Sequence, residues 1–213
     1  MGRASGGRKG RLAARFAEVK QFNPAAPGQI GGQYKPLSDK ELLDILDTAF
    51  RILEKIGMAE VPDVVMEAAL EQGCAVNSIG RLSMPRSFVE DIIDGACKSF
   101  TFYGRNPDQT IQVGGERTWF GTGGAAVQTL DMETDLYRSS TLKDLYDFTR
   151  LVDRLENVAW FTRCCVATDM EDNFDLDVNT AYAMMKGTQK PVGMSFTIGD
   201  YVHPIIEMFD LVA

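Results

Sequence analysis

A glycine-rich turn is the first stretch of this sequence whose residues suggest chemistry. Gly121-Thr122-Gly123-Gly124 follows an apolar segment, and the backbone amides of such a turn can approach a phosphate closely. The dinucleotide-binding fingerprint, however, needs a third glycine that opens a helix. Here that position is Ala126, and residues 127–130 continue a strand pattern. The pattern favours a tight turn at the carboxyl end of a barrel strand, where barrel enzymes place their sites, over a nicotinamide-dependent oxidoreductase.

Aromatic side chains in or beside the predicted strands offer a second kind of site. They are Trp119, Phe120, Trp160, Phe161 and Phe196. Aromatic ring faces attract quaternary ammonium ions through cation–π interactions. Aromatic residues in buried strands more often belong to the hydrophobic core. Both interpretations stay open at this point.

Arg163 interrupts an otherwise apolar strand. A buried guanidinium needs a hydrogen-bonded acidic partner, and Asp169, Glu171 and Asp172 follow closely in the sequence. A structural ion pair is therefore favoured over a substrate contact for Arg163. The same acids fit either an acid–base pair or a solvated loop that caps the next helix, and the capping loop is favoured.

Cysteine and histidine usage argues against a metal site. Cys74, Cys97, Cys164, Cys165 and the single histidine, His203, show none of the ligand spacings of zinc. One histidine also leaves no Ser-His-Asp or Cys-His arrangement. We expect no bound metal, free and inert thiols in a reducing compartment, and a structural or surface role for His203.

The charge distribution disfavours nucleic acid as a partner. The 213-residue chain has a net charge of −8, although residues 1–20 carry six basic residues and one acid. An acidic body repels phosphates, and no apolar run approaches the roughly 20 residues that cross a bilayer. A secretory signal is absent from the N-terminal stretch. We expect a cytoplasmic protein without membrane or nucleic-acid partners, with a disordered basic tail and linker at residues 1–36.

Residues 37–98 predict a small helical N-terminal region. Ser38-Asp39-Lys40-Glu41 is a capping box, and apolar residues then recur at helical spacing until Gly57. A second helix begins at Pro62 and a third at Pro85. The apolar stripes of these helices must be buried, and we expect them to pack against the next domain.

From residue 99 the pattern changes to strands, and later to alternating helices and strands. The predicted elements are strands at 99–103, 110–113, 117–120, 127–131 and 136–138, then a helix at 141–155, a strand at 158–166, a helix at 177–186, a strand at 191–196 and a helix from Asp200. Alternating units of this kind predict parallel strands joined by right-handed crossovers.

These units predict an α/β fold, an incomplete (β/α)₈ barrel of the TIM type with about the first three strand–helix units. A closed barrel takes roughly 200 residues or more. Since the chain ends within a helical pattern at residues 209–213, we expect residues 99–213 to be the first part of a truncated barrel. A small, complete open sheet is the alternative.

Six segments of the chain form an ordered series: GQYKPLS at 32–38, AFRILEKIG at 49–57, RLSMP at 81–85, KSFTFYGRNPD at 98–108, WFGTGG at 119–124 and LDMETDLYRSST at 130–141. Together they resemble the trimethylamine methyltransferase family, which includes members without pyrrolysine such as glycine betaine methyltransferases. An ordered series over about residues 30–170 is more specific than any one segment.

The resemblance implies a (β/α)₈ barrel that transfers a methyl group from a tertiary or quaternary amine to the cob(I)alamin of a separate corrinoid protein. It also implies that no cofactor binds directly and that the full-length protein is a homo-oligomer. No residue matches a catalytic residue of the family, so position at the rim selects the substrate-binding candidates. They are Phe120, Thr122, Gly123, Gly124, Phe161, Arg163 and Phe196. The alternative is a non-catalytic truncated piece that acts only in binding or assembly.

Overall fold

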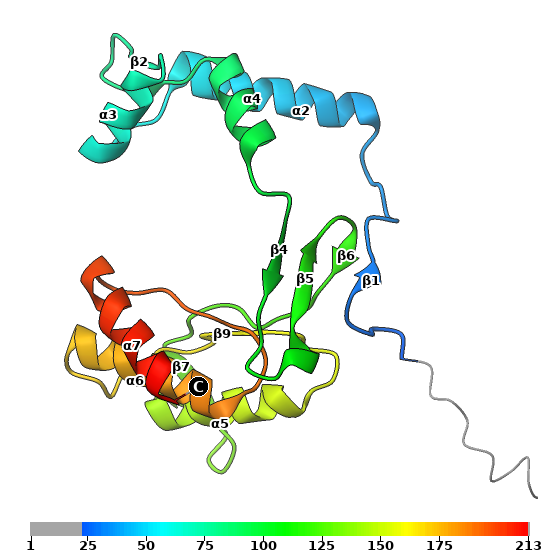
Figure 1. Cartoon of the computed structure of the whole chain (residues 1–213), viewed down its shortest axis with the longest axis vertical. Coiled ribbons are helices and arrows are strands. Elements are labelled where there is room, and N and C mark those ends of the chain that lie inside the picture. Colours follow the sequence, from blue (N-terminus) through cyan, green and yellow to red (C-terminus); the bar gives the residue numbers. More distant parts are fainter. Residues whose placement is uncertain (1–22, 213) are drawn as a thin grey trace, which may run out of the picture.

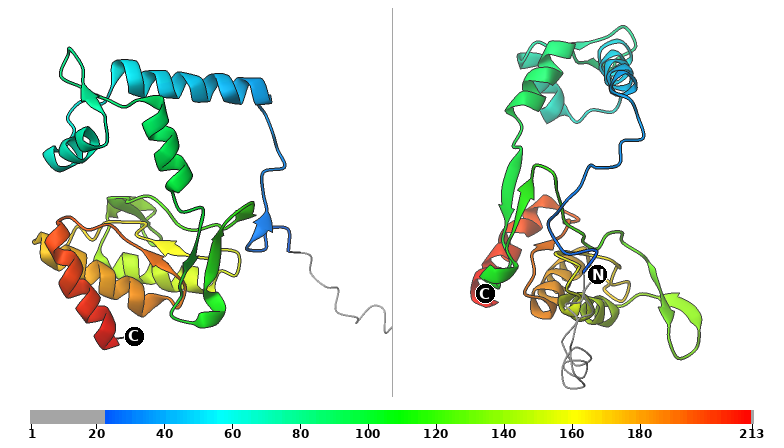
Figure 2. Two further views of the ribbon diagram at one scale, coloured as in Figure 1. Left: turned by 45° about the horizontal axis from the view of Figure 1, so that its top comes forward. Right: turned by 90° about the vertical axis from the view of Figure 1, so that its right-hand side faces the viewer.

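The computed structural model describes residues 23–212, which form two parts joined by extended chain (Figure 1). One part holds the helices α2 (Asp39–Arg51), α3 (Asp63–Glu71) and α4 (Arg86–Gly95). The other holds α5 (Leu142–Arg154), α6 (Asn173–Gly187) and α7 (Val202–Val212). Two further views show the same separation (Figure 2). Residues 1–22 of the tail and linker predicted at residues 1–36 lie outside the described residues.

The predicted capping box at Ser38 begins helix α2. Ser38 Oγ accepts a hydrogen bond from Glu41 N at 3.3 Å, and Glu41 Oε2 accepts one from Ser38 N at 2.7 Å. These bonds satisfy amides that have no partner within the helix. The helix changes to a π-helical turn, η1 (Ile52–Ile56), and ends at Gly57, whose φ of 76° favours glycine.

A short hairpin completes the helical region. Strand β2 (Ala75–Val76) pairs antiparallel with β3 (Leu82–Ser83). The buried side chains of Ala69, Cys74 and Leu82 form a small cluster beneath helices α3 and α4, against which Phe88 packs. This cluster gives the region a hydrophobic core of its own.

The apolar face of α2 is exposed, contrary to the expectation that it packs against the next domain. Leu43 is 64% exposed and Ile45 is 57% exposed. Phe50 is the one buried residue of this helix, and the Arg86 guanidinium lies 4.6 Å from the centre of its ring. Extended chain flanks the helical region on both sides (Figure 2), so within residues 23–212 no element of the other part reaches this face.

Antiparallel pairs connect the two parts. Strand β4 (Ser99–Phe102) pairs with β5 (Ile111–Gly114), and Ser99 lies opposite Gly114. The predicted turn between them contains a 3₁₀ turn, η2 (Pro107–Gln109). These positions agree with the sequence-based expectation for residues 99–113.

Ordered structure begins before Leu37, where the sequence predicted only a linker. Strand β1 (Gln29–Ile30) pairs antiparallel with β6 (Arg117–Thr118). Asn23 Nδ2 also donates a hydrogen bond to Asn157 Oδ1 at 2.6 Å. Both partners are distant in sequence, and the local Pro and Gly content of the linker gives no sign of them.

Strand and helix then alternate in the order that the sequence predicted. The hairpin of β7 (Gln128–Asp131) and β8 (Leu136–Ser139) leads into α5. Strand β9 (Phe161–Thr162) follows α5, β10 (Val192–Gly193) follows α6, and a 3₁₀ turn, η3 (Gly199–Tyr201), leads into α7. Helix α6 begins four residues earlier than predicted, because Asp172 caps it.

Three segments of this part run in parallel. Phe161 of β9 lies opposite Val192 of β10. On the other edge, Gly121 is bridged to Trp160 and Ala126 to Cys165, also in parallel. The three segments therefore lie side by side in sequence order, which is how a parallel barrel begins. The complete barrel stays a prediction.

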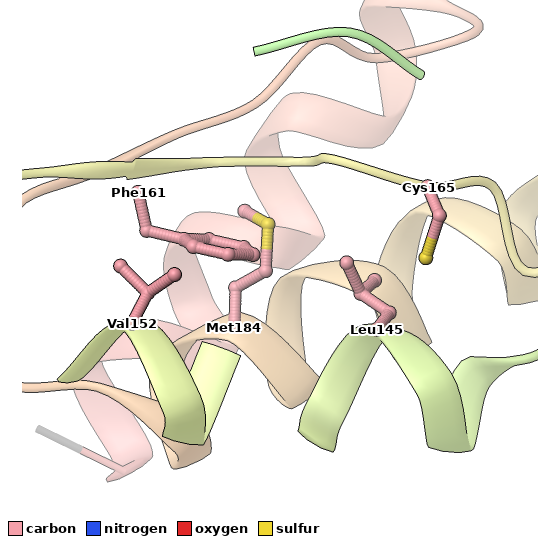
Figure 3. Close-up of a cluster of buried hydrophobic side chains, with 5 residues drawn as sticks. All are labelled: Leu145, Val152, Phe161, Cys165 and Met184. Carbon is pink, nitrogen blue, oxygen red and sulfur yellow. The ribbon is translucent and has the colours of Figure 1, made fainter. Parts of the chain in front are cut away.

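Helices α5 and α6 cover one face of the parallel segments. Leu145 and Val152 of α5, Met184 of α6, and Phe161 and Cys165 of the central segment form the core between them (Figure 3). Burying an apolar side chain of this size stabilises a fold by roughly 1.5–3 kcal/mol. Among the described helices, none has the length and apolarity needed to span a membrane.

Candidate functional site

Residues 121–126 pair with the neighbouring strand only at their two ends. Gly121 and Ala126 are bridged to that strand, and the Thr122 side chain spans the interval between them. Thr122 Oγ1 accepts a hydrogen bond from Thr162 N at 2.8 Å and donates one to Thr162 O at 2.7 Å. The Thr122 side chain thereby satisfies the Thr162 amide and carbonyl, which in a regular ladder pair with backbone groups of the neighbouring strand. Local departures from a ladder re-aim side chains and occur frequently beside active sites.

Gly123 and Gly124 form the exposed part of this departure. Gly124 has a φ of 91°, a conformation that other residues rarely adopt. A Cβ atom at either glycine would meet nothing within 4 Å. Backbone conformation at Gly124, rather than close approach of another group, therefore accounts for glycine there. Both glycines lie toward the carboxyl end of the parallel segments.

Ser140 ties the carboxyl ends of two parallel segments together. Its side chain is fully buried, and its Oγ lies 3.1 Å from Ala126 O and 2.7 Å from Val166 O as a hydrogen-bond donor. The Thr168 hydroxyl and amide both donate to Ser140 O, at 2.7 Å and 3.0 Å. This residue fixes the rim immediately before α5 begins.

A charged cluster fastens the β7–β8 hairpin to the start of α5. Arg138 Nε lies 3.0 Å from Asp131 Oδ2, and the Arg138 guanidinium binds both Asp144 oxygens, at 2.7 Å and 2.8 Å. The hydrogen bond from Arg138, aided by backbone amides of the hairpin turn, lowers the pKa of Asp131 to about 2. Arg138 also lowers the pKa of Asp144, and partial burial opposes this effect. Both carboxyl groups are therefore charged at neutral pH and do not act as acids there.

The acidic residues after β9 cap two helices. Asp169 Oδ1 accepts a hydrogen bond from Leu142 N at 2.9 Å, at the start of α5. Asp172 Oδ1 accepts one from Phe174 N at 2.6 Å, at the start of α6. Carboxylates at helix N-termini satisfy free amides and complement the helix dipole. The capping interpretation of this loop is confirmed.

Arg163 forms no ion pair with the described residues, so the expected pair is wrong. The ion pairs within 4.0 Å in residues 23–212 involve other basic side chains. Two of the acids proposed as partners, Asp169 and Asp172, face helix N-termini instead. The partly buried residue Arg163 therefore lies toward the carboxyl end of its strand and forms no ion pair with a described carboxylate.

The two tryptophans have structural partners. Trp119 Nε1 donates a hydrogen bond to Gln112 O at 2.9 Å. The ring of Trp160 lies 6.2 Å from that of Phe102, and a Cβ atom at Gly121 would overlap it. Trp160 therefore packs on the face of the parallel segments opposite the one where Phe161 meets the helices.

Phe161 and Phe120 do not occupy the positions predicted for them. Phe161 is fully buried between the strand and helices α5 and α6 (Figure 3). Phe120 O accepts a hydrogen bond from Ala159 N at 2.7 Å. Because the parallel segments run from there toward Ala126, Phe120 lies at their amino end. Neither ring is at the carboxyl rim.

Phe196 follows β10 and is held by a residue that the sequence analysis missed. The amide and hydroxyl of its neighbour Thr197 donate to Asp177 Oδ2, at 2.6 Å and 2.8 Å. Asp177 is fully buried in α6, and its Oδ1 has no hydrogen-bond partner among the described residues. The sequence did offer a sign that Asp177 has a structural role, because it is an acid on the apolar side of a predicted helix. No comparable signal marked Ser140.

The candidates that remain toward the carboxyl ends are few. They are Thr122, Gly123, Gly124, Arg163 and Phe196. They offer backbone donors, a guanidinium and an aromatic face, which suit binding better than proton transfer. Within the described residues, no three His, Cys, Asp or Glu side chains gather as metal ligands would, and His203 is exposed.

The structure is thus one of mixed helices and short strands, and its candidate site lies toward the carboxyl ends of the parallel segments. The chain belongs to the trimethylamine methyltransferase family, because the family model described as Trimethylamine methyltransferase (MTTB) matches residues 3–213. The family predicted from the sequence is thereby confirmed.

Two curated relatives come from Desulfitobacterium hafniense. The chain is 28% identical over 177 residues to the trimethylamine methyltransferase MttB of strain DSM 10664 / DCB-2, covering 83% of this chain and 36% of that protein. It is 29% identical over 133 residues to the glycine betaine methyltransferase of strain Y51, covering 62% of this chain and 27% of that protein. The chain thus spans well under half the length of either relative.

Proposed function

We propose that the protein containing this chain transfers a methyl group from a tertiary or quaternary amine to the cob(I)alamin of a separate corrinoid protein. The observation that carries this proposal is the family match over residues 3–213, together with relatives named for trimethylamine and glycine betaine. The acceptor is a second substrate carried by the partner, so it needs no resident site on this chain.

The proposed reaction is a displacement at the methyl carbon. The cobalt(I) electron pair forms a cobalt–carbon bond while the carbon–nitrogen bond breaks and its electrons stay on nitrogen. A quaternary ammonium leaves as a neutral amine without proton transfer, whereas a tertiary amine must be protonated before it can leave. The enzyme therefore has to hold a cationic nitrogen, expose one methyl group and exclude water.

We further propose that the parallel segments are the first strands of a (β/α)₈ barrel whose carboxyl rim holds the amine. Their parallel order and the helices on one face support this. On this rim Phe196 would supply an aromatic wall for the cation, and the turn at Gly123 and Gly124 would supply backbone groups. Arg163 would meet a negative group on the substrate or on the corrinoid partner.

The decisive experiment uses the full-length protein. It is mixed with chemically reduced cob(I)alamin and, separately, with trimethylamine, glycine betaine and tetramethylammonium. Conversion to methylcobalamin is followed by absorbance. The proposal expects turnover with at least one of these compounds, and a Phe196→Ala variant should show a raised KM for it. The absence of methyl transfer from every methylated amine tested would reject the proposal.

We also propose a cytoplasmic location and a homo-oligomeric full-length protein. The free state of Cys74, Cys97, Cys164 and Cys165 supports a reducing compartment. Fractionation and light scattering of the full-length protein test the two statements separately.

A further inference from the structure

Two consecutive cysteines of the central parallel segment line the same cavity. Cys164 and Cys165 both line a hollow of about 380 Å³ between the parallel segments and helix α5. Neighbouring residues of a regular strand point to opposite faces of the sheet. Here both share a cavity that Thr122 also lines, at the place where residues 122–125 depart from the ladder.

The remaining walls of this cavity are mainly apolar. Phe148, Leu151 and Val152 of α5 lie on one side, and Leu130 of the β7 strand lies on another. The cavity is therefore bordered by two cysteines in surroundings that hydrate a hard metal ion poorly. Soft ions prefer thiolate ligands, and hard cations prefer oxygen ligands.

The two cysteines differ in exposure. Cys165 is 2% exposed, whereas Cys164 is only partly buried and packs against the core cluster that includes Cys165. An incoming ion would therefore reach Cys164 first, with Cys165 behind it on the same cavity.

A zinc site does not fit this pair. Zinc takes four ligands in structural sites and at least three protein ligands in catalytic sites. Among residues 23–212 no third Cys, His, Asp or Glu joins the two thiols as a ligand would. An ion of low coordination number, for which two sulfur ligands are enough, does fit this pair of cysteines.

We propose that Cys164 and Cys165 form a chelating dithiol site for a soft, thiophilic metal or metalloid ion of low coordination number, such as trivalent arsenic. For an organic arsenic(III) oxide, two sulfur–arsenic bonds form, the arsenic–oxygen double bond is lost, and the two thiol protons leave with the oxygen as water. No oxidant or reductant is required. Arsenic binding is measured without any methyl transfer, so this proposal is tested independently of the proposed function.

The test uses phenylarsine oxide and the full-length protein in excess glutathione. Glutathione keeps the cysteines reduced and displaces arsenic held by a single thiol, so chelated arsenic alone persists. Digestion and mass spectrometry then show whether the peptide containing residues 164–165 carries one phenylarsenic group. The proposal expects one adduct there in the wild-type protein.

Single substitutions identify the ligands. Cys164→Ser, Cys165→Ser and Cys165→Ala should each raise the phenylarsine oxide concentration needed for half-saturation more than tenfold. The matched control is Cys97→Ser, at an exposed cysteine, which should change that concentration less than twofold. Thermal melts confirm that each variant is folded, and Cys165→Ala is included because the site of Cys165 is buried.

Three results would overturn the proposal. The first is no adduct on the wild-type peptide. The second is binding that persists unchanged in folded Cys164→Ser or Cys165→Ala protein. The third is a peptide two mass units lighter without arsenic, which would show that the thiols join each other as a disulfide rather than chelating an ion.

Discussion

The hydroxyl of Thr122 replaces a stretch of backbone pairing with Thr162. It accepts the Thr162 amide at 2.8 Å and donates to the Thr162 carbonyl at 2.7 Å. The Thr162 hydroxyl continues the chain by donating to Gly193 O at 2.8 Å. Two threonines therefore link all three parallel segments, while Gly123 and Gly124 are left free of the ladder.

Removing the Thr122 hydroxyl should destabilise the protein. In Thr122→Val, both backbone groups of Thr162 lose their partner while the side chain keeps its shape. We expect the free energy of unfolding to fall by about 1–3 kcal/mol, measured by denaturant unfolding of the full-length protein. Thr122→Ser retains the hydroxyl and should lose clearly less. Equal losses in the two variants would show that the methyl group, not the hydroxyl, matters.

Lys190 should contribute to stability through three carbonyl groups. Its Nζ donates to Val152 O at 2.8 Å, Leu155 O at 2.7 Å and Val158 O at 2.6 Å. Lys190→Met should lower the free energy of unfolding by about 1–3 kcal/mol, since these carbonyls lose a charged donor.

The control for Lys190 is Lys186→Met on the exposed side of α6. We expect a change within about 0.5 kcal/mol there. A similar loss in both variants would mean that overall charge, rather than the three carbonyl contacts, determines the effect.

The β7–β8 hairpin should loosen in acid. The pKa of Asp131 is about 2 in the folded protein against an ordinary value of 3.8. Because the folded-state pKa is lowered, the stabilisation by Asp131 is fully present above about pH 4 and is lost as the pH falls from 3.8 toward 2. Amide exchange of the hairpin across this range measures the effect.

Arg138→Gln supplies the control for the acid experiment. Arg138 is the main cause of the lowered Asp131 pKa, so this variant should return that pKa toward 3.8 in an NMR titration. A pKa that stays near 2 would assign the shift to the backbone amides of the turn instead.

Asp177 should hold the segment that carries Phe196. Asp177→Asn weakens the charge-assisted hydrogen bonds to Thr197, so the Thr197 amide should exchange with solvent at least tenfold faster. Asp175→Asn removes the same charge from an exposed position of α6 and should leave that exchange unchanged. If Asp177→Asn also leaves it unchanged, the contact does not restrain this segment.

Local signals predicted most helix boundaries, although α6 begins four residues earlier than predicted. The capping box at Ser38 depends on residues three positions apart and forms as predicted, and the helix predicted at 141–155 begins with a similar box at Thr141. Gly57 ends its helix by adopting a positive φ, so this boundary depends on one residue alone. Such features need no knowledge of distant parts of the chain.

Features that depend on pairing register were harder to predict. Phe120 and Phe161 lie within predicted strands, yet their positions depend on which residues face each other across the parallel segments. The sequence places Arg163 near three acids, but two of them, Asp169 and Asp172, bind helix N-termini instead. The strand pairing of residues 29–30 with β6 also arises only when distant segments meet.

The two feet of the β7–β8 hairpin meet at its base, where Ser140 N donates to Val127 O at 3.1 Å. The strand before the hairpin and the helix after it are therefore fastened at the base, by this bond and by Arg138, while residues 132–137 at the tip are exposed. A change in the length or sequence of residues 132–137 should therefore leave the junction beneath the hairpin in place.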